Sequence, residues 1–127
     1  MKFIFSPKGL AIAGLIASFI LLTLPGSDLP DVGSWSQYVQ LDKWVHIVMF
    51  AGLVWLFCRW RALSHGQMPG VKMFLLIMLA VFVYGFGMEF VQKYFIPNRS
   101  FDMHDVMADG IGCLLGFLVS RRMYYKK

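Results

Sequence analysis

Four apolar runs alternate with short polar segments along the chain. The runs cover residues 9–24, 44–60, 71–92 and 103–120. Each is close to the roughly 17–25 residues that an α-helix needs to cross the hydrocarbon core of a bilayer. Pro, Gly, Asp and Ser gather between the runs, where they favour turns. The pattern predicts an all-α fold in which four transmembrane helices form an up-and-down bundle.

The whole chain, residues 1–127, is expected to form one integral membrane domain. Residues 25–43 and 93–102 are the expected outer loops, and residues 61–70 the inner loop. The first run also has the outline of a secretory signal peptide, because Lys2 and Lys8 precede it. Its exit at residues 23–26 lacks a cleavage site of the Ala-x-Ala kind, so the sequence favours a retained first helix.

The composition supports a membrane protein. Hydrophobic residues make up 58% of the chain and charged residues 15%, and the mean hydropathy is +0.63. Soluble domains have about 45–50% apolar and about 25% charged residues. The net charge of +5 is a weak argument for nucleic-acid binding, because a basic balance in a membrane protein usually reflects its topology. The lipid bilayer is therefore the expected partner, and nucleic acid is not.

The cations predict the orientation of the helices. With the N-terminus inside, the inner segments hold nine of the twelve Lys and Arg residues, and the outer loops hold Lys43, Lys93 and Arg99. This bias follows the positive-inside rule and predicts that both termini are cytoplasmic. All seven acidic residues then fall on the outer side: Asp28, Asp31, Asp42, Glu89, Asp102, Asp105 and Asp109.

Three of the predicted helices carry polar side chains near their outer ends. They are Asp42, Lys43 and His46 in the second helix, Glu89 and Gln92 in the third, and Asp102, Asp105 and Asp109 in the fourth. Separations of three, four or seven residues place side chains on one face of a helix. A charged side chain at membrane depth costs roughly 2.5–3.5 kcal/mol, so a chain that keeps several usually uses them. The pattern predicts one polar site at the outer end of the bundle.

The cations near this end indicate a ligand with negative charge. Arg99 lies in a turn just before the fourth helix, and a guanidinium beside a helix N-terminus is a good receptor for phosphate or carboxylate. Together with Lys43 it would hold an anionic lipid or a cell-wall precursor. The residues expected to bind this ligand are Asp42, Lys43, Gln92, Arg99 and Asp109.

The same side chains also suit a membrane enzyme. His46 would act as general acid or base, with Glu89 or Asp105 as its carboxylate partner. The pattern establishes no cofactor and leaves the metal open, although one His with several carboxylates is compatible with a divalent cation such as Mg²⁺ or Mn²⁺. A proton or ion path and an accessory subunit of an envelope enzyme also remain as alternatives.

Simpler roles compete for several of these residues. Asp102 and Asp105 could cap the fourth helix, because Asp-x-x-Asp resembles a capping box. Glu89 and Lys93 are four residues apart and could form an ordinary interfacial pair. Asp109 fits neither role, because it lies too deep for a cap and has no local cation.

The small residues of the third and fourth helices predict close packing. Gly85 lies one turn below Glu89, where it would let a neighbouring helix approach. Gly112 and Gly116 form a Gly-x-x-x-Gly pair, which favours a close helix contact over ligand binding. The chain has no Cys-x-x-Cys motif, and its two cysteines lie within apolar runs, so no redox or zinc role is expected.

Two segments resemble the VanZ-like family. They are DKWVHIVMFAGL at residues 42–53 and EFVQKYFIPNRSFDMHDVMADGIG at residues 89–112. The resemblance implies a small multi-pass protein of the bacterial cytoplasmic membrane, with no established chemical activity. The founding member of the family is associated with resistance to the glycopeptide teicoplanin. The family's polar set would correspond to Asp42, Lys43, His46, Glu89, Gln92, Arg99 and Asp105. This chain departs from the pattern at Asp109, where Asn is usual, so the site is more anionic.

Overall fold

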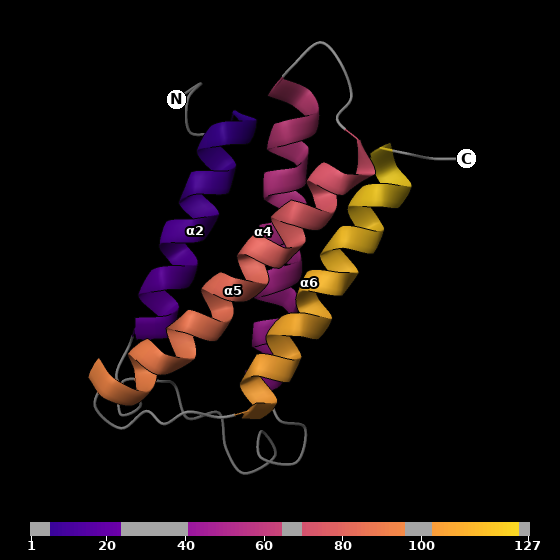
Figure 1. Ribbon diagram of the computed structural model, residues 1–127. Helices are drawn as coiled ribbons and strands as arrows, with labels where there is room; N and C mark the ends of the chain where they lie inside the picture. The colour runs from indigo at the N-terminus through magenta and orange to yellow at the C-terminus, as the bar shows by residue number, and fades with distance from the viewer. Residues whose placement is uncertain (1–5, 24–40, 65–69, 96–102, 125–127) are drawn as a thin grey trace.

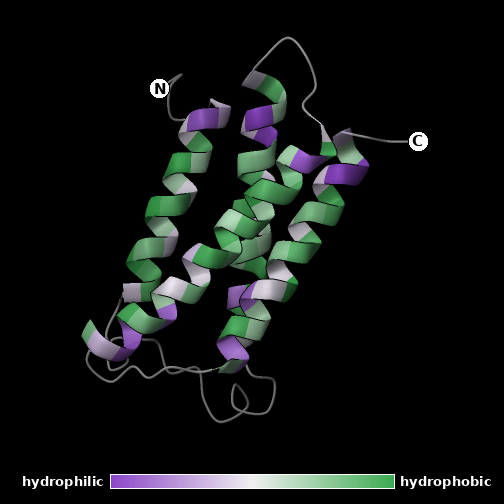
Figure 2. Cartoon of the chain, viewed as in Figure 1, coloured by the Kyte–Doolittle hydropathy of each residue, from purple (hydrophilic) through white to green (hydrophobic). Residues whose placement is uncertain are grey.

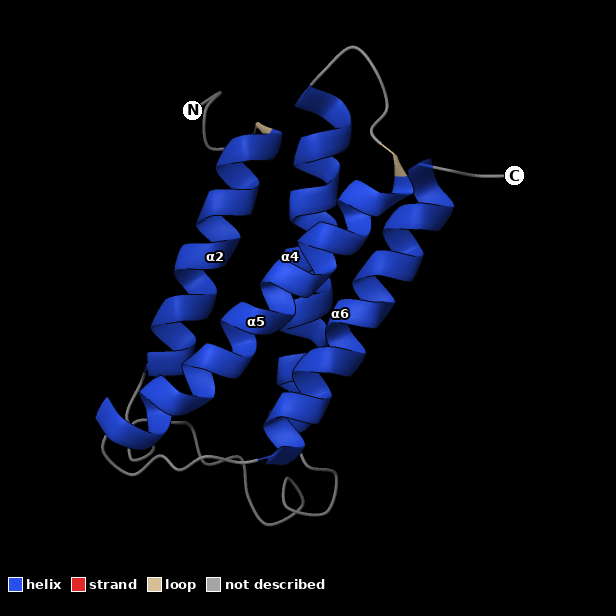
Figure 3. Ribbon diagram, viewed as in Figure 1, coloured by secondary structure: helices blue, strands red, loops and turns tan. Residues whose placement is uncertain are grey.

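The protein is an all-helical bundle. The computed structural model describes residues 6–23, 41–64, 70–95 and 103–124, which contain four α-helices (Figure 3). They are α2 (Pro7–Thr23), α4 (Leu41–Ser64), α5 (Val71–Phe95) and α6 (Met103–Tyr124). Consecutive helices run in opposite directions, and α5 crosses the bundle obliquely in front of α4 (Figure 1). The predicted up-and-down arrangement is confirmed.

Length and composition suit these helices to a membrane. Three of the described helices are long and apolar enough to cross a bilayer: Trp44–Ser64, Val71–Phe95 and Met103–Tyr124. Helix α2 is also apolar and has 17 residues, which is the lower limit for a membrane span. Many large apolar side chains lie on the outside of the bundle, among them Val48 at 69% exposure and Val83 at 66%. These outward faces suit contact with lipid.

Local signals at the helix ends explain where the helices begin and how far they run. The Ser6 hydroxyl accepts a hydrogen bond of 3.0 Å from the Gly9 amide, and Pro7 follows at the first helical position, so α2 starts with a favourable cap. Helices α4 and α6 extend about one turn beyond their apolar runs. The residues of those last turns include Arg61, Arg121 and Arg122, which are good helix formers and suit a helix C-terminus.

Helix α4 occupies the centre of the bundle and contacts all three other described helices. Its buried stripe is Phe50, Val54 and Cys58, each with 0% exposure and spaced four residues apart. Phe74 of α5 and Phe117 of α6 also belong to this core. The spacing of the stripe follows directly from the 3.6-residue repeat of the α-helix.

The closest helix contact is between α4 and α6, at two glycines. A Cβ atom on Gly112 would overlap the Ile47 carbonyl, and one on Gly116 would lie 2.5 Å from the Ala51 carbonyl oxygen. The absence of side chains at these positions lets α6 lie directly on the backbone of α4. The predicted close contact is confirmed, and α4 is the partner helix.

The two ends of the bundle differ in charge. The end where α4 and α6 begin carries the described acidic side chains, Glu89, Asp105 and Asp109, and is called the polar end below. The other end carries most of the described cations and is called the basic end. These cations are Lys8, Arg59, Arg61, Lys72, Arg121 and Arg122. Apolar residues fill most of the length between the two ends (Figure 2).

Candidate functional site

His46 occupies the second turn of α4, on the side that faces into the bundle. Its exposure is 7%, and its ring stacks on Phe50 one turn deeper, with ring centroids 6.3 Å apart and an interplanar angle of 11°. The Phe50 ring in turn lies 6.1 Å from the ring of Tyr84 on α5. These aromatic contacts fix the plane of the imidazole.

Asp109 of α6 is the hydrogen-bond partner of His46. The distance between His46 Nδ1 and Asp109 Oδ1 is 2.7 Å, and Asp109 is 1% exposed. An ionised carboxylate can only accept, so with Asp109 ionised the Nδ1–H group donates. In a neutral imidazole the lone pair then lies on Nε2.

The second ring nitrogen faces a second carboxylate on α6. His46 Nε2 lies 4.0 Å from Asp105 Oδ2, which is within ion-pair distance but too long for a hydrogen bond. Asp105 precedes Asp109 by one helical turn and is therefore nearer the polar end. The His46 ring thus lies between two acids, with Nδ1 toward the deeper one.

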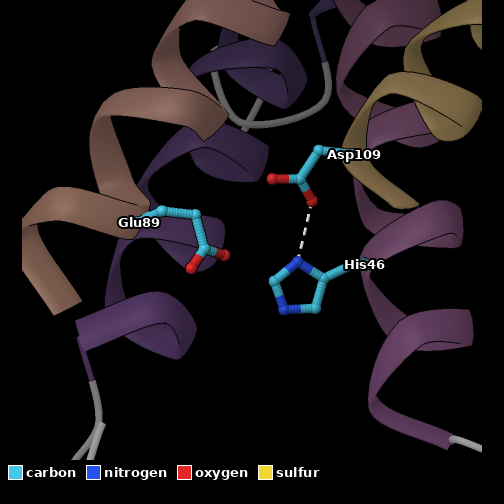
Figure 4. A group of neighbouring side chains, drawn as sticks. All are labelled: His46, Glu89 and Asp109. Atoms are coloured by element: carbon cyan, nitrogen blue, oxygen red, sulfur yellow. Dashed lines mark hydrogen bonds and ion pairs between the residues drawn. The ribbon is translucent and has the colours of Figure 1, made fainter. Parts of the chain in front are cut away.

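Glu89 enters the same volume from α5. Its exposure is 1%, and its carboxylate faces the His46 ring and Asp109 (Figure 4). One donor atom from each of His46, Glu89 and Asp109 lies within 4.8 Å of the others. These three residues, called the His–Glu–Asp cluster below, come from three different helices. Two carboxylates and one imidazole at this spacing could hold a proton, a cation or a polar ligand.

Gly85 makes the space in which this cluster packs. A Cβ atom there would lie 2.7 Å from Phe50 Cε1 and 2.8 Å from Asp109 Oδ2. The sequence predicts close approach of a neighbouring helix at Gly85, and the described neighbours are side chains from two helices. A methyl group at Gly85 would press on the aromatic support and on the carboxylate together.

Gln92 is buried on the α2 side of the polar end. Its exposure is 2%, and its Nε2 atom donates a hydrogen bond of 2.8 Å to the carbonyl of Leu22. That carbonyl belongs to the last turn of α2, where the helix itself supplies no donor. The described contact of Gln92 therefore ties α5 to α2, and its predicted role in ligand binding stays a prediction.

Ser18 and Tyr84 form a second polar contact between α2 and α5, which the sequence reasoning missed. The two hydroxyl oxygens are 2.9 Å apart. Ser18 donates its single proton to the Leu15 carbonyl at 2.8 Å, so Tyr84 donates to Ser18. The available signal was a hydroxyl residue in the middle of each of two apolar runs.

The structure brings together only part of the predicted site. His46, Glu89 and Asp109 form the cluster, and Asp105 lies beside it. Asp42 and Lys43 belong to the first turn of α4, but their side chains lie outside the described part of the structure, as do Arg99 and Asp102 altogether. The roles predicted for these four residues stay predictions, including the alternative of Asp102 as a helix cap.

Comparison with known proteins identifies the family. The family model VanZ/LLP1 matches residues 5–124, which include all four described helices and every described site residue. The chain belongs to the VanZ/LLP1 family. No match was found among curated proteins or among solved structures. The protein is therefore a VanZ-like membrane protein with several spans.

The residue at position 109 determines the charge of the His–Glu–Asp cluster. The family resemblance noted above implies Asn at this position, and an Asn side-chain oxygen could accept the same hydrogen bond from His46 Nδ1. Asp109 keeps this geometry and adds a negative charge 2.7 Å from the imidazole. Relative to Asn, Asp at this position adds charge to the His–Glu–Asp cluster and keeps an oxygen that can accept from His46.

Proposed function

We propose that this VanZ-like protein lies in the bacterial cytoplasmic membrane and binds the headgroup of an anionic lipid or lipid-linked cell-wall precursor at its polar end. The observation that carries the proposal is the convergence of His46, Glu89 and Asp109, each at least nine-tenths buried, from three helices. Burial of charged groups at membrane depth is costly and is usually retained for function. The site would serve a headgroup in the leaflet that the polar end faces.

The charge distribution supports a position of the polar end in the outer leaflet. Most of the described Lys and Arg residues lie at the basic end, and the positive-inside rule places such an end in the cytoplasm. The polar end would then face the cell exterior or periplasm, where cell-wall precursors are consumed. Both chain termini would be cytoplasmic in this orientation.

Arg99 and Lys43 are the residues proposed to hold the anionic part of the ligand. Arg99 comes four residues before the start of α6, and Lys43 belongs to the first turn of α4. A helix N-terminus favours negative charge, and a guanidinium can bind two phosphate oxygens at once. Lys43 is thus part of the helix that carries His46, and Arg99 shortly precedes the helix that carries Asp109.

Lipid binding by the purified full chain tests this proposal. The protein would be placed in phosphatidylcholine nanodiscs and offered phosphatidylglycerol or undecaprenyl phosphate, with diacylglycerol and undecaprenol as uncharged controls. Bound lipid would be counted by native mass spectrometry. Loss of a hydrogen bond to a charged group costs about 1.5–3 kcal/mol, so R99A should weaken binding of the phosphate lipids by about tenfold or more.

Lys93 provides the matched control cation. It is exposed at the same end, and its ammonium group lies 5.2 Å from the centroid of the Tyr94 ring. K93A should leave phosphate-lipid binding within a factor of two or so of wild type, as for a rim charge. If R99A and K43A retain phosphate lipids as well as K93A does, the proposed role of Arg99 and Lys43 in holding the anion is excluded.

A membrane enzyme is the second candidate, and one observation favours it. The 2.7 Å hydrogen bond orients His46 so that Nε2 lies on the side of the ring away from Asp109 (Figure 4). A histidine held through Nδ1 by a carboxylate is a common arrangement for proton transfer at Nε2. Mass spectrometry of lipid extracts from cells with the wild type or H46Q would test it. Identical headgroups in both strains would exclude catalysis and leave binding.

Glycopeptide tolerance is the finer function suggested by the family resemblance. A protein that holds a cell-wall precursor at the outer leaflet would change how much of it a glycopeptide can reach. Expression in a susceptible strain should then raise the inhibitory concentration of teicoplanin, and R99A should return it to the control value. An inhibitory concentration unaffected by expression would remove drug tolerance from the proposal, and lipid binding would be judged on its own measurement.

A further inference from the structure

The His–Glu–Asp cluster has the donors and the spacing of a metal site. One imidazole nitrogen and two carboxylate oxygens lie within 4.8 Å of one another, and each of the three residues is at least nine-tenths buried. We propose that His46, Glu89 and Asp109 bind one divalent cation, Mn²⁺ or Mg²⁺. The role of the ion rests on the proposed function, but its binding can be measured without any lipid.

The distances agree with coordination of a small ion. A six-coordinate ion with bonds of about 2.1 Å places neighbouring donors about 3 Å apart and opposite donors about 4.2 Å apart. The distance of 2.7 Å between His46 Nδ1 and Asp109 Oδ1 is close to the first value, and 4.8 Å is the upper bound for the whole set.

The donor types favour Mn²⁺ or Mg²⁺ over zinc. Carboxylate oxygens and water suit Mg²⁺ and Mn²⁺, whereas protein zinc sites usually have more His or Cys ligands. The two described cysteines, Cys58 and Cys113, lie within the bundle core and are not among the donors. Three protein donors leave three positions on a six-coordinate ion for water or for oxygens of a ligand.

Asp105 provides an independent observation that points to a ligand at this place. A histidine that binds a metal through one nitrogen almost always gives the hydrogen of its other nitrogen to a carboxylate, a carbonyl or water. His46 Nε2 belongs to a side chain that is 9% exposed, and it faces Asp105 Oδ2 at 4.0 Å. With an ion on Nδ1, the proton lies on Nε2 and Asp105 is its acceptor, directly or through one water.

A bound ion also resolves a conflict of charge in the proposed function. A phosphate headgroup is repelled by the carboxylates of Glu89 and Asp109, which lie within the same cluster. Mg²⁺ and Mn²⁺ commonly join one or two protein carboxylates to the phosphate oxygens of a ligand. The ion would make an acidic site into a receptor for an anion.

Titration of the metal alone tests the site. The full-length protein in nanodiscs of phosphatidylcholine would be titrated with Mn²⁺, and free Mn²⁺ would be followed by electron paramagnetic resonance. One saturable ion per chain is expected in the wild type. D105N removes the acceptor for the Nε2 proton and should lower the Mn²⁺ affinity by roughly 10–100-fold. E89Q and D109N each remove a direct ligand, so each should lower the affinity by more than that.

His104 supplies the matched control, because it is an exposed histidine one residue before Asp105 on α6. H104Q should bind Mn²⁺ like the wild type. A pulsed measurement of nitrogen coupling on the bound Mn²⁺ gives a second readout on wild-type protein: a coupling should be present and should be lost in H46Q. No saturable Mn²⁺ in the wild type, wild-type affinity in both E89Q and D109N, or no nitrogen coupling would each overturn the site.

One further measurement distinguishes failure of the metal site from failure of the proposed function. Native mass spectrometry of bound phosphatidylglycerol would be repeated with Mn²⁺ and with a chelator, and Mn²⁺ should increase its retention about tenfold or more. Bound Mn²⁺ with no retained phosphate lipid would support the metal site and contradict the proposed function. Equal lipid retention under both conditions would overturn the ion as a bridge, whatever its affinity for the protein.

Discussion

His46 lies beside two acids of α6 and is hydrogen-bonded to the deeper one. Asp105 and Asp109 are one helical turn apart, and the two imidazole nitrogens face one acid each, at 4.0 Å and 2.7 Å. The stack on Phe50 restrains the ring from the deeper side. With these neighbours around it, the buried imidazole has little freedom to rotate. Its two nitrogens therefore keep fixed directions within the site.

The hydrogen bond between His46 and Asp109 should stabilise the fold because Asp109 supplies an acceptor oxygen. The negative charge of Asp109 should matter less for stability. D109A leaves the buried Nδ1–H group without an acceptor and should lower the free energy of unfolding by about 1–3 kcal/mol. D109N keeps an oxygen that can accept, so its loss should be clearly smaller. Unfolding in mixed micelles of dodecyl maltoside and SDS measures both. Equal losses in the two variants would contradict the importance of the acceptor.

The residues of the site were largely predictable, but their pairing was not. His46, Glu89 and Asp109 stand out in the sequence as polar side chains in apolar runs. The sequence pattern favours Asp105 or Glu89 as the partner of His46, whereas the hydrogen bond goes to Asp109. Periodicity places Asp105 and Asp109 on one face of α6 but does not fix how far α6 slides along α4. A slide of one turn exchanges the two acids.

At the scale of the helix, the contact between α4 and α6 fixes the position of α6 along α4. Gly112 lies against the backbone of Ile47, and Gly116 lies against Ala51. Both pairs are spaced by four residues, so the two helices meet in register along one groove. Asp109, three residues before Gly112, is thereby brought to His46, one residue before Ile47.

A methyl group in this groove should separate the helices. G112A places a Cβ atom into the backbone of Ile47, and overpacking of this kind costs about 1–3 kcal/mol. Gly87 is the matched control, because an added Cβ there meets nothing within 4 Å. G87A should be neutral or stabilising by up to about 1 kcal/mol, since Ala favours helix more than Gly does. Unfolding in SDS compares the two, and equal stability would contradict the close contact.

Helix α2 is joined to α5 by polar contacts along apolar surfaces. Tyr84 donates to Ser18, and Gln92 donates to the Leu22 carbonyl at the end of α2. Between helices in a membrane, a hydrogen bond is directional whereas apolar contacts are not, because lipid tails compete equally for apolar faces. These two contacts therefore set the position of α2 along α5.

A double-mutant cycle measures the contact between Ser18 and Tyr84. Y84F and S18A should each reduce stability, and their coupling energy should be about 0.6 kcal/mol, the average for hydrogen bonds between membrane helices. Y84F removes only the hydroxyl, so the ring contact with Phe50 is retained. Unfolding in SDS gives the four stabilities. Strict additivity of the two changes would exclude a direct hydrogen bond.

At the scale of the whole molecule, the fold follows from features that a sequence displays directly. Four apolar runs at the length of a membrane span leave few alternatives to a helical bundle, and short connections make neighbours antiparallel. The oblique course of α5 and the central place of α4 were not predictable. They depend on which small residues and hydroxyls meet across helices, and helix periodicity carries no information about partners.

The orientation of the bundle decides which leaflet the polar end serves. Six described cations lie at the basic end, at or near the ends of the helices where the positive-inside rule acts most strongly. An alkaline phosphatase fused after Asn98 should therefore be active outside the cytoplasm, and one fused after Ser64 should be inactive. Fusions of a green fluorescent protein at the same two sites should give the opposite pattern. Phosphatase activity after Ser64 with none after Asn98 would place His46, Glu89 and Asp109 at the cytoplasmic leaflet, and a precursor bound there would be one still awaiting export.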